Sequence, residues 1–264
     1  MRNGKIGFIG AGKMAEGILH AIDDKSSVIM AEKNIDRANE ISSKYSVSVV
    51  SDLSTLIREC KIVFLCVRPQ DVESVAREIN GALKPTQILV SIVAGKKLSY
   101  LRKAFGTKVK LVRVMPNLAL RANAGMSALC APANVTSADI SKVEKILQGA
   151  GRTVILKEKD FDAVTALSGS GPAYFAYMAQ AMAEGGVALG LKRDVANILA
   201  LQTMFGTAKF LLESSMPLEP FIAGVATKGG TTAAGMVEMS SSQFNDIVAK
   251  TLAAAARRSK ELAK

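Results

Sequence analysis

Two glycine-rich stretches lie in the second half of the sequence, where the pattern otherwise favours long helices. They read LSGSGPAY at 167–174 and TKGGTTAAG at 227–235, and each ends at the start of a predicted helix. Paired glycines cost a helix interior about 1 kcal/mol each. At a helix N-terminus, however, they free backbone N–H groups to bind a carboxylate or phosphate, and Thr231 and Thr232 add hydroxyl donors. The pair predicts an anion cradle, although either stretch alone also fits an interhelical loop with a threonine N-cap.

A third glycine-rich turn, GAGKMA at 10–15, directly follows the first strand-like run and fits the pattern G-x-G-x-x-G/A. Gly10 permits a tight turn, Gly12 lets a pyrophosphate approach the backbone, and Ala15 keeps the next helix close to the sheet. That helix presents its N-terminal N–H groups to the phosphates. The turn predicts a dinucleotide site, although similar turns also occur in folds that bind no nucleotide.

The residues after the second strand-like run bear on which dinucleotide would bind. Glu32 stands about 20 residues beyond the glycines, where an acid can hold the ribose 2′-hydroxyl of NAD. Lys33 and Arg37 follow and could instead neutralise the 2′-phosphate of NADP, although both positions also suit a solvated helix start. We expect NADP as the cofactor, with NADPH preferred and NADH possible.

Other chemistries lack the residues that they need. Ser170 has no glycine two positions before it, as a nucleophile elbow requires, and the sole histidine, His20, lies on the first predicted helix. No cluster of His, Cys, Asp and Glu has metal-site spacing. A reaction without a strong side-chain acid or base remains, and hydride transfer from a nicotinamide fits because the cofactor carries the hard chemistry.

The elements that would position these residues alternate along the first half of the chain. Strand-like runs stand at 5–10, 27–32, 47–50, 61–67, 87–93 and 108–115. Helix-compatible segments lie between them, at 12–22, 34–45, 70–82 and 97–104. GMSALCA and RTVILK flank a helix near 137–149 and extend the sheet. This alternation predicts an α/β fold with a doubly wound parallel sheet.

The strand signal disappears from about residue 158, which predicts a dinucleotide-binding domain at 1–157 and a helical domain at 158–264. The helical segments are 171–190, 192–213 and 243–264. The segment 173–190 is apolar around most of its circumference, which is typical of a helix buried on more than one side. A central core helix and a subunit interface both fit. The small size of this half favours the interface, so we expect a homodimer or higher homo-oligomer.

Composition narrows the class of protein. The 264 residues carry a formal net charge of +11, but the basic residues are scattered and there is no tryptophan, so we expect no nucleic-acid partner. No apolar run reaches the length of a membrane span, and the chain starts without the regions of a signal peptide. Three cysteines without metal-site spacing indicate reduced thiols. We therefore expect a soluble cytoplasmic protein without a membrane partner or metal.

Along essentially its whole length the sequence resembles pyrroline-5-carboxylate reductases. The markers are, in order, GFIGAGKMA at 7–15, CVRPQDV at 66–72, SIVAG at 91–95, VRVMPN at 112–117, LSGSGPAY at 167–174 and GGTTAAG at 229–235. The first is common to many dehydrogenases, whereas the ordered combination of MPN, SGSGPAY and GGTT is much more specific.

The resemblance implies reduction of (S)-1-pyrroline-5-carboxylate to L-proline, the last step of proline biosynthesis, by an N-terminal Rossmann domain and a helical C-terminal dimerisation domain. In the family the N–H groups of GGTT bind the substrate carboxylate and the second threonine meets the ring nitrogen. These substrate-binding roles would fall to Gly230, Thr231 and Thr232, with Thr232 also catalytic and Ser170 in the same pocket. The implied cofactor contacts are Ile9, Gly10, Ala11, Gly12, Lys13, Met14, Cys66, Val67, Arg68, Pro69, Ile92, Ala94 and Asn117.

The sequence also departs from the family pattern. Lys13 replaces the usual asparagine of the first turn, Lys228 the usual proline before the paired glycines, and Ala223 a common acidic residue. Lys228 could strengthen carboxylate binding or mark a shifted substrate. The alternatives are therefore a reductase of another imine or of a keto acid, and a non-catalytic NAD(P)-sensing paralogue. Retention of both SGSGP and GGTT speaks against the sensor.

Overall fold

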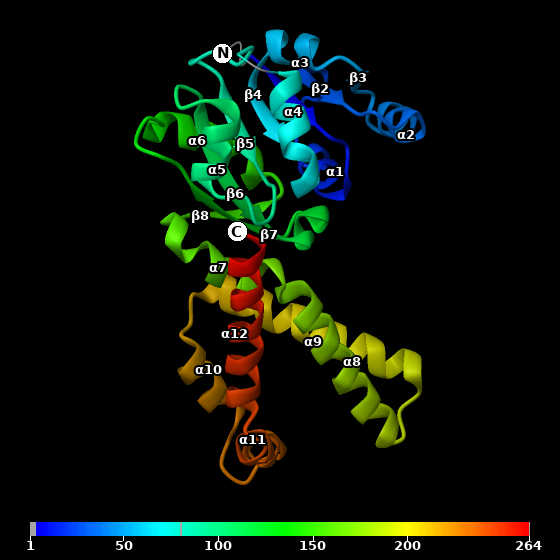
Figure 1. The fold of residues 1–264 in the computed structure, drawn as a ribbon. Helices are drawn as coiled ribbons and strands as arrows, with labels where there is room; N and C mark the ends of the chain where they lie inside the picture. The colour runs from blue at the N-terminus through cyan, green and yellow to red at the C-terminus, as the bar shows by residue number, and fades with distance from the viewer. Residues whose placement is uncertain (1–3, 80, 264) are drawn as a thin grey trace. The chain divides into compact units, whose positions relative to one another are not determined.

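The computed structural model describes residues 4–79 and 81–263, which form two compact units (Figure 1). The first unit comprises the chain up to Ser170 together with the C-terminal residues from Ala255, and the second unit is Gly171–Ala254.

The first unit is built on one eight-stranded sheet in the order β3-β2-β1-β4-β5-β6-β7-β8. All neighbouring strands pair in parallel except β6 and β7, which are antiparallel. The strands are β1 Lys5–Ile9, β2 Val28–Ala31, β3 Ser48–Val50, β4 Cys60–Leu65, β5 Ile88–Ser91, β6 Lys110–Pro116, β7 Gly125–Cys130 and β8 Gly151–Ile155. The predicted doubly wound sheet is confirmed. Its one reversal follows from the short connection between β6 and β7, because only a longer crossover joins parallel neighbours.

Helices cover both faces of this sheet and enclose two hydrophobic cores. One core contains side chains from α1, α2 and α6, and the other contains side chains from α3, α4 and α5. Successive residues of a strand point to opposite faces, so Phe8 enters the first core and Ile9 the second. The bounds are α1 Lys13–His20, α2 Ile35–Tyr45, α3 Leu53–Glu59, α4 Val72–Glu78, α5 Leu98–Phe105 and α6 Ser137–Gln148.

The first unit extends beyond residue 157, where the sequence predicts a domain boundary. Glu158 accepts hydrogen bonds from the Leu98 N–H at 2.6 Å and from Arg113 Nη1 at 2.9 Å. Phe161, in the short helix α7 Phe161–Val164, is buried in the second core. These contacts place the residues after 157 on the first unit, up to the π-helical turn η5 Thr165–Gly169.

The C-terminal turns of the chain also belong to the first unit. The last helix, α12 Phe244–Leu262, places the Ser259 hydroxyl 2.7 Å from Asp162 Oδ1, to which it donates. A methyl group built on Gly95 would lie 2.9 Å from the Leu262 carbonyl oxygen. The end of α12 is therefore packed against the loop that follows β5.

The second unit is entirely helical in its described secondary structure. Its elements are α8 Gly171–Ala188, α9 Arg193–Ser214, α10 Leu218–Val225, α11 Thr231–Ser241 and the first part of α12. The helices α8 and α9 pack through small side chains, with Ala183, Ala196 and Ala200 buried. Most large apolar side chains of the unit are exposed, including Tyr177, Ile198 and Phe205, which are 73%, 67% and 61% exposed. The segment predicted to be apolar all round is therefore not a central core helix of this unit.

Candidate cofactor and substrate sites

The turn between β1 and α1 has the shape that its glycines predict. Gly10 has φ +93°, a left-handed conformation, and a methyl group built there would lie 2.8 Å from the Cys66 carbonyl oxygen. Gly12 is the N-cap of α1, and no described side chain caps this helix end. Nothing lies within 4 Å of a methyl built on Gly12. The space in front of the α1 N–H groups is thus open to an anion.

A pocket of about 390 Å³ opens beside this turn, where the carboxyl ends of β1, β2 and β4 meet. The strand order reverses direction between β1 and β4, and ligands of doubly wound sheets bind at such a switch point. The pocket joins the glycine turn to Cys66, Val67 and Arg68 of the CVRP segment. Its lining is Ile9, Gly10, Ala11, Gly12, Ala31, Glu32, Lys33, Ser51, Leu53, Cys66, Val67, Arg68, Asp71, Ser74 and Val75.

Several of these lining residues escape prediction from the sequence, among them Leu53 and Val75. The sequence pattern does not predict α3, which has only seven residues and begins at the Asp52 N-cap. The Asp52 carboxylate accepts from the N–H groups of Ser54 and Thr55, both at 3.0 Å. An aspartate followed by two hydroxyl residues is the local signal that could have revealed the helix.

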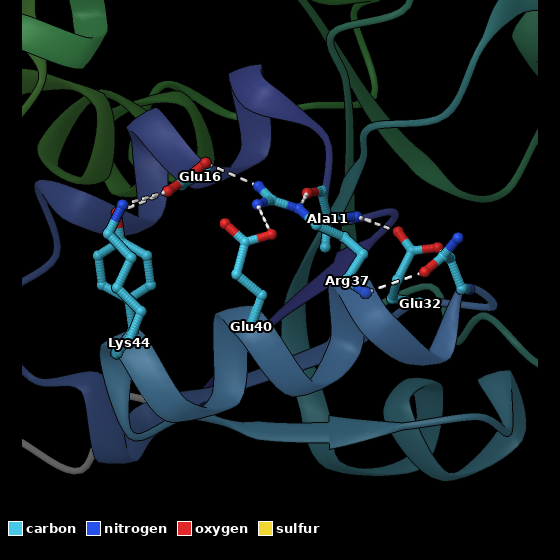
Figure 2. Close-up of polar contacts among 8 residues, drawn as sticks. Ala11, Glu16, Glu32, Arg37, Glu40 and Lys44 are labelled. Atoms are coloured by element: carbon cyan, nitrogen blue, oxygen red, sulfur yellow. Dashed lines mark hydrogen bonds and ion pairs between the residues drawn. The ribbon is translucent and has the colours of Figure 1, made fainter.

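Charged residues line an adjoining pocket of about 570 Å³, between the N-terminal parts of α1 and α2. Glu16 is one of its lining residues, and the side chain of Glu16 is 7% exposed and accepts from Lys44, Arg37 and Tyr45 (Figure 2). The hydrogen bond from Lys44 and the contacts of Arg37 lower the pKa of Glu16 from 4.5 to about 2, although burial opposes this. Glu16 is therefore a carboxylate at any physiological pH.

The two predicted basic readers of a 2′-phosphate both form ion pairs in the structure. Lys33 Nζ lies 3.1 Å from Glu78 Oε2, and the lysine side chain is 74% exposed. Arg37 contacts Glu16 and Glu40, each at 2.7 Å. A surface ion pair such as that of Lys33 contributes little to stability. Arg37, in contrast, contacts two carboxylates at once.

The MPN and SGSG motifs meet within the first unit. Asn117 Nδ2 donates to Ser168 Oγ at 3.3 Å, and a methyl built on Gly169 would lie 2.6 Å from Met115 Cε. Ser170 follows the π-helical turn η5, and its N–H donates to the Thr165 carbonyl at 2.9 Å. π-Helical turns are frequent at functional sites. Ser168 is a contact that the sequence reasoning missed, although it lies inside the SGSG motif.

The loop after β5 carries the predicted cofactor contacts Ile92 and Ala94. The Ile92 N–H donates to the Leu65 carbonyl at 3.2 Å, which fixes this loop to the end of β4. Gly95, which follows Ala94 in this turn, has φ +73°, a left-handed conformation that favours glycine.

The GGTT motif begins α11 in the second unit. Gly229 has φ +76°, the Gly230 N–H donates to the Thr227 carbonyl at 3.0 Å, and Gly230 is the N-cap of the helix. No described side chain caps α11. Thr231 and Thr232 are therefore the first two residues of the helix, and the alternative reading of a threonine N-cap is wrong. Their free N–H groups can bind an anion.

Taken by itself, the first unit has the fold and the glycine turn of a dinucleotide-binding protein of the Rossmann class. The described residues fit such a cofactor because Gly12 leaves room at a helix N-terminus and the switch-point pocket combines apolar walls with polar edges. Comparison with known proteins gives the family. Residues 158–262 match the model described as "Pyrroline-5-carboxylate reductase dimerisation", and residues 5–95 match "NADP oxidoreductase coenzyme F420-dependent".

Relatives similar over their full length agree with these matches. The pyrroline-5-carboxylate reductase of Arabidopsis thaliana is 36% identical, with 98% of this chain and 95% of the relative covered. That of Pseudomonas aeruginosa is 34% identical, with 100% and 98% covered. The solved structure of the Coxiella burnetii reductase has a TM-score of 0.95 at 28% identity, with both chains fully covered. A Plasmodium falciparum reductase with NADP bound has a TM-score of 0.87 at 30% identity over both full lengths. The chain belongs to the pyrroline-5-carboxylate reductase family.

Proposed function

We propose that the protein reduces (S)-1-pyrroline-5-carboxylate to L-proline with NADPH, and that NADH also serves. The full-length relatives support the reaction. The Plasmodium falciparum structure with NADP and the NADP oxidoreductase match at 5–95 support the cofactor. The observation that carries the proposal is the uncapped start of α11 at GGTT, in a chain that also has a glycine turn for a dinucleotide.

The first unit would hold the cofactor along the edge where its strands end. Gly10, Gly12 and the start of α1 would receive the pyrophosphate, with Lys13 beside it. The segment from Cys66 to Pro69 and the loop carrying Ile92 and Ala94 would line the rest. When bound, the nicotinamide supplies a hydride to the imine carbon.

The second unit would hold the substrate. Its carboxylate would bind to the N–H groups of Thr231 and Thr232 in the first turn of α11, where no intrahelical acceptor is available, beside Gly230, whose own N–H donates to the Thr227 carbonyl. The Thr232 hydroxyl would orient the protonated imine nitrogen or pass it a proton from water, since a threonine is too weak an acid to protonate it alone. We propose that Ser170 also contacts the substrate. Orientation and exclusion of water would supply most of the rate enhancement.

We also propose that the second unit joins two copies of the chain into a dimer or a larger homo-oligomer. The many exposed large apolar side chains on α8 and α9 support this, because large exposed apolar surfaces mark interaction sites. By length and composition α9 could also cross a membrane, with a mean hydropathy of 1.3. It lies inside the dimerisation match, so we assign its apolar surface to a second copy and propose a cytoplasmic enzyme.

The experiment that tests the function compares three substrates with the purified protein. Oxidation of NADPH and of NADH is followed with pyrroline-5-carboxylate, a piperideine-carboxylate and ketopantoate. We expect pyrroline-5-carboxylate to give the largest kcat/KM with either dinucleotide. Preference for one of the other two would indicate a shifted substrate, and binding of dinucleotide without any turnover would indicate the sensing paralogue.

A further inference from the structure

The two peptide groups that meet at Ala11, in the glycine turn, are each held by a charged side chain from the end of the next strand or from the next helix. The Ala11 N–H donates to Glu32 Oε2 at 2.9 Å, and the Ala11 carbonyl accepts from Arg37 Nε at 2.8 Å (Figure 2). Glu32 directly follows β2, and Arg37 lies in the first turn of α2. Ala11 itself is fully buried. Glu32 thus fixes the Gly10–Ala11 peptide group, and Arg37 fixes the Ala11–Gly12 peptide group.

Arg37 is in turn fixed at its other nitrogens. Its Nη2 donates to Glu16 Oε2 and its Nη1 to Glu40 Oε2, each at 2.7 Å. Such short contacts are those of charge-assisted hydrogen bonds. The Arg37 side chain is only 23% exposed, and Glu16 is 7% exposed. Two carboxylates therefore already balance the charge of this guanidinium.

Glu32 is fixed in the same way at its second oxygen. Glu32 Oε1 accepts from the Asn34 N–H at 2.9 Å. Its carboxylate therefore stands between the glycine turn and the start of α2, and it lines both pockets. A 2′-phosphate that approached Arg37 would meet this carboxylate and those of Glu16 and Glu40, and like charges at short range repel.

We propose that Arg37 is a positioning residue that holds the glycine turn in its dinucleotide-binding shape and does not read the 2′-phosphate. The inference rests on the proposed use of a nicotinamide dinucleotide. Arg37 acts through the Ala11 carbonyl, and the N–H groups at the start of α1 keep their direction because the peptide before them cannot turn. Since NADPH and NADH share the pyrophosphate, the loss of Arg37 weakens the binding of both dinucleotides to the same degree.

The test measures the binding of NADPH and of NADH to the protein without substrate, by titration calorimetry. In Arg37→Ala we expect both dissociation constants to rise about tenfold or more, the scale of a lost charge-assisted hydrogen bond, with their ratio unchanged within about twofold. Arg37→Lys keeps the charge but cannot span Ala11, Glu16 and Glu40 together. It therefore loses most of the binding of both dinucleotides as well. Rescue of NADPH binding by Arg37→Lys would overturn the proposal.

A matched pair of carboxylate variants sharpens the test. Glu16→Gln removes the buried partner of Arg37, so we expect both dinucleotides to bind more weakly. Glu40→Gln removes an exposed partner and leaves the contact with Ala11, so both dissociation constants stay within about twofold. If Arg37 instead reads the phosphate, either change frees it and strengthens NADPH binding alone, which would overturn the proposal.

Hydrogen–deuterium exchange provides a readout that does not depend on cofactor. We expect the backbone amides of residues 10–15 to exchange faster in Arg37→Ala and in Glu32→Gln than in the wild type, and at the wild-type rate in Glu40→Gln. Unchanged exchange in Arg37→Ala would contradict the positioning role. Failure of the wild-type protein to bind either dinucleotide would count against the proposed function instead, so the two failures are distinguishable.

Discussion

The side chain of Asn117 ties the end of β6 to the π-helical turn that contains Ser168. Its Nδ2 donates to Ser168 Oγ at 3.3 Å, and its Oδ1 accepts from the Met126 N–H at 3.1 Å. Asn117 is thus the link between the MPN and SGSG motifs within the first unit, and it also fixes the start of β7.

Truncation of Asn117 is expected to lower the stability of the fold. Asn117→Ala leaves the Met126 N–H without its partner, which should lower the free energy of unfolding by about 1–3 kcal/mol. Ser168→Ala removes only the weaker bond and should cost less than about 1 kcal/mol. Urea unfolding of the two variants and of the double variant measures this. Additive effects would show that the two side chains do not interact.

The glycine turn offers a matched pair of substitutions that separate folding from cofactor binding. Gly10→Ala forces a methyl against the Cys66 carbonyl oxygen at φ +93°, so it should lower the melting temperature and abolish dinucleotide binding. Gly12 has φ −67° and open space before it. Gly12→Ala should therefore fold normally but bind NADPH far more weakly, because its methyl occupies the space of the pyrophosphate. Normal NADPH binding by Gly12→Ala would show that the pyrophosphate does not bind at this turn.

The oligomeric state can be tested on two isoleucines of similar exposure. Ile198 on α9 is 67% exposed, and Ile35 on α2 is 75% exposed. Ile198→Asp should dissociate the assembly into a 27.8 kDa species in sedimentation experiments, because a buried charge at an interface lacks a partner. Ile35→Asp lies outside the dimerisation match and should leave the assembly intact. A wild-type protein that sediments only as a 27.8 kDa species would rule out the dimer.

The lowered pKa of Glu16 predicts that the folded protein loses part of its stability in acid. Its pKa in the folded protein, about 2, is lower than its ordinary value of 4.5. Ionised Glu16 therefore stabilises the fold fully above pH 4.5, and this contribution is lost as the pH falls toward 2. At about 1.4 kcal/mol for each pKa unit, the contribution is roughly 3 kcal/mol. In urea unfolding, the gap between wild type and Glu16→Gln should narrow across this range. A constant gap would contradict the assignment.

The features predicted correctly from the sequence are those that depend on neighbouring residues. Short runs rich in Val and Ile became strands at the predicted places, and the spacing of Gly10 and Gly12 gave both the turn and the helix that starts after it. The segment 173–190 became a helix with exposed apolar side chains.

Features that depend on contacts between residues far apart in the chain could not be predicted from the sequence. Arg37 could equally have faced a phosphate or solvent, and only the packing of α1 beside α2 brings it to Ala11 and Glu16. The contact of Asn117 with Ser168 joins residues 51 positions apart, so local pattern carries no sign of it. The roles of Ser170, Gly230, Thr231 and Thr232 toward substrate stay predictions.

The measurement that tests the account most directly is the steady-state kinetics of pyrroline-5-carboxylate reduction in three threonine variants. Thr231 would contribute mainly its backbone N–H, so Thr231→Ala should change kcat/KM by only a few-fold. Thr232→Ser keeps the hydroxyl and should retain most activity. Thr232→Val keeps the shape but removes the hydroxyl, so kcat/KM should fall about 10- to 100-fold, while NADPH affinity, measured separately, stays unchanged. If Thr232→Val turned over like the wild type, Thr232 would have only a structural role in the helix, and the proposed mechanism would be contradicted.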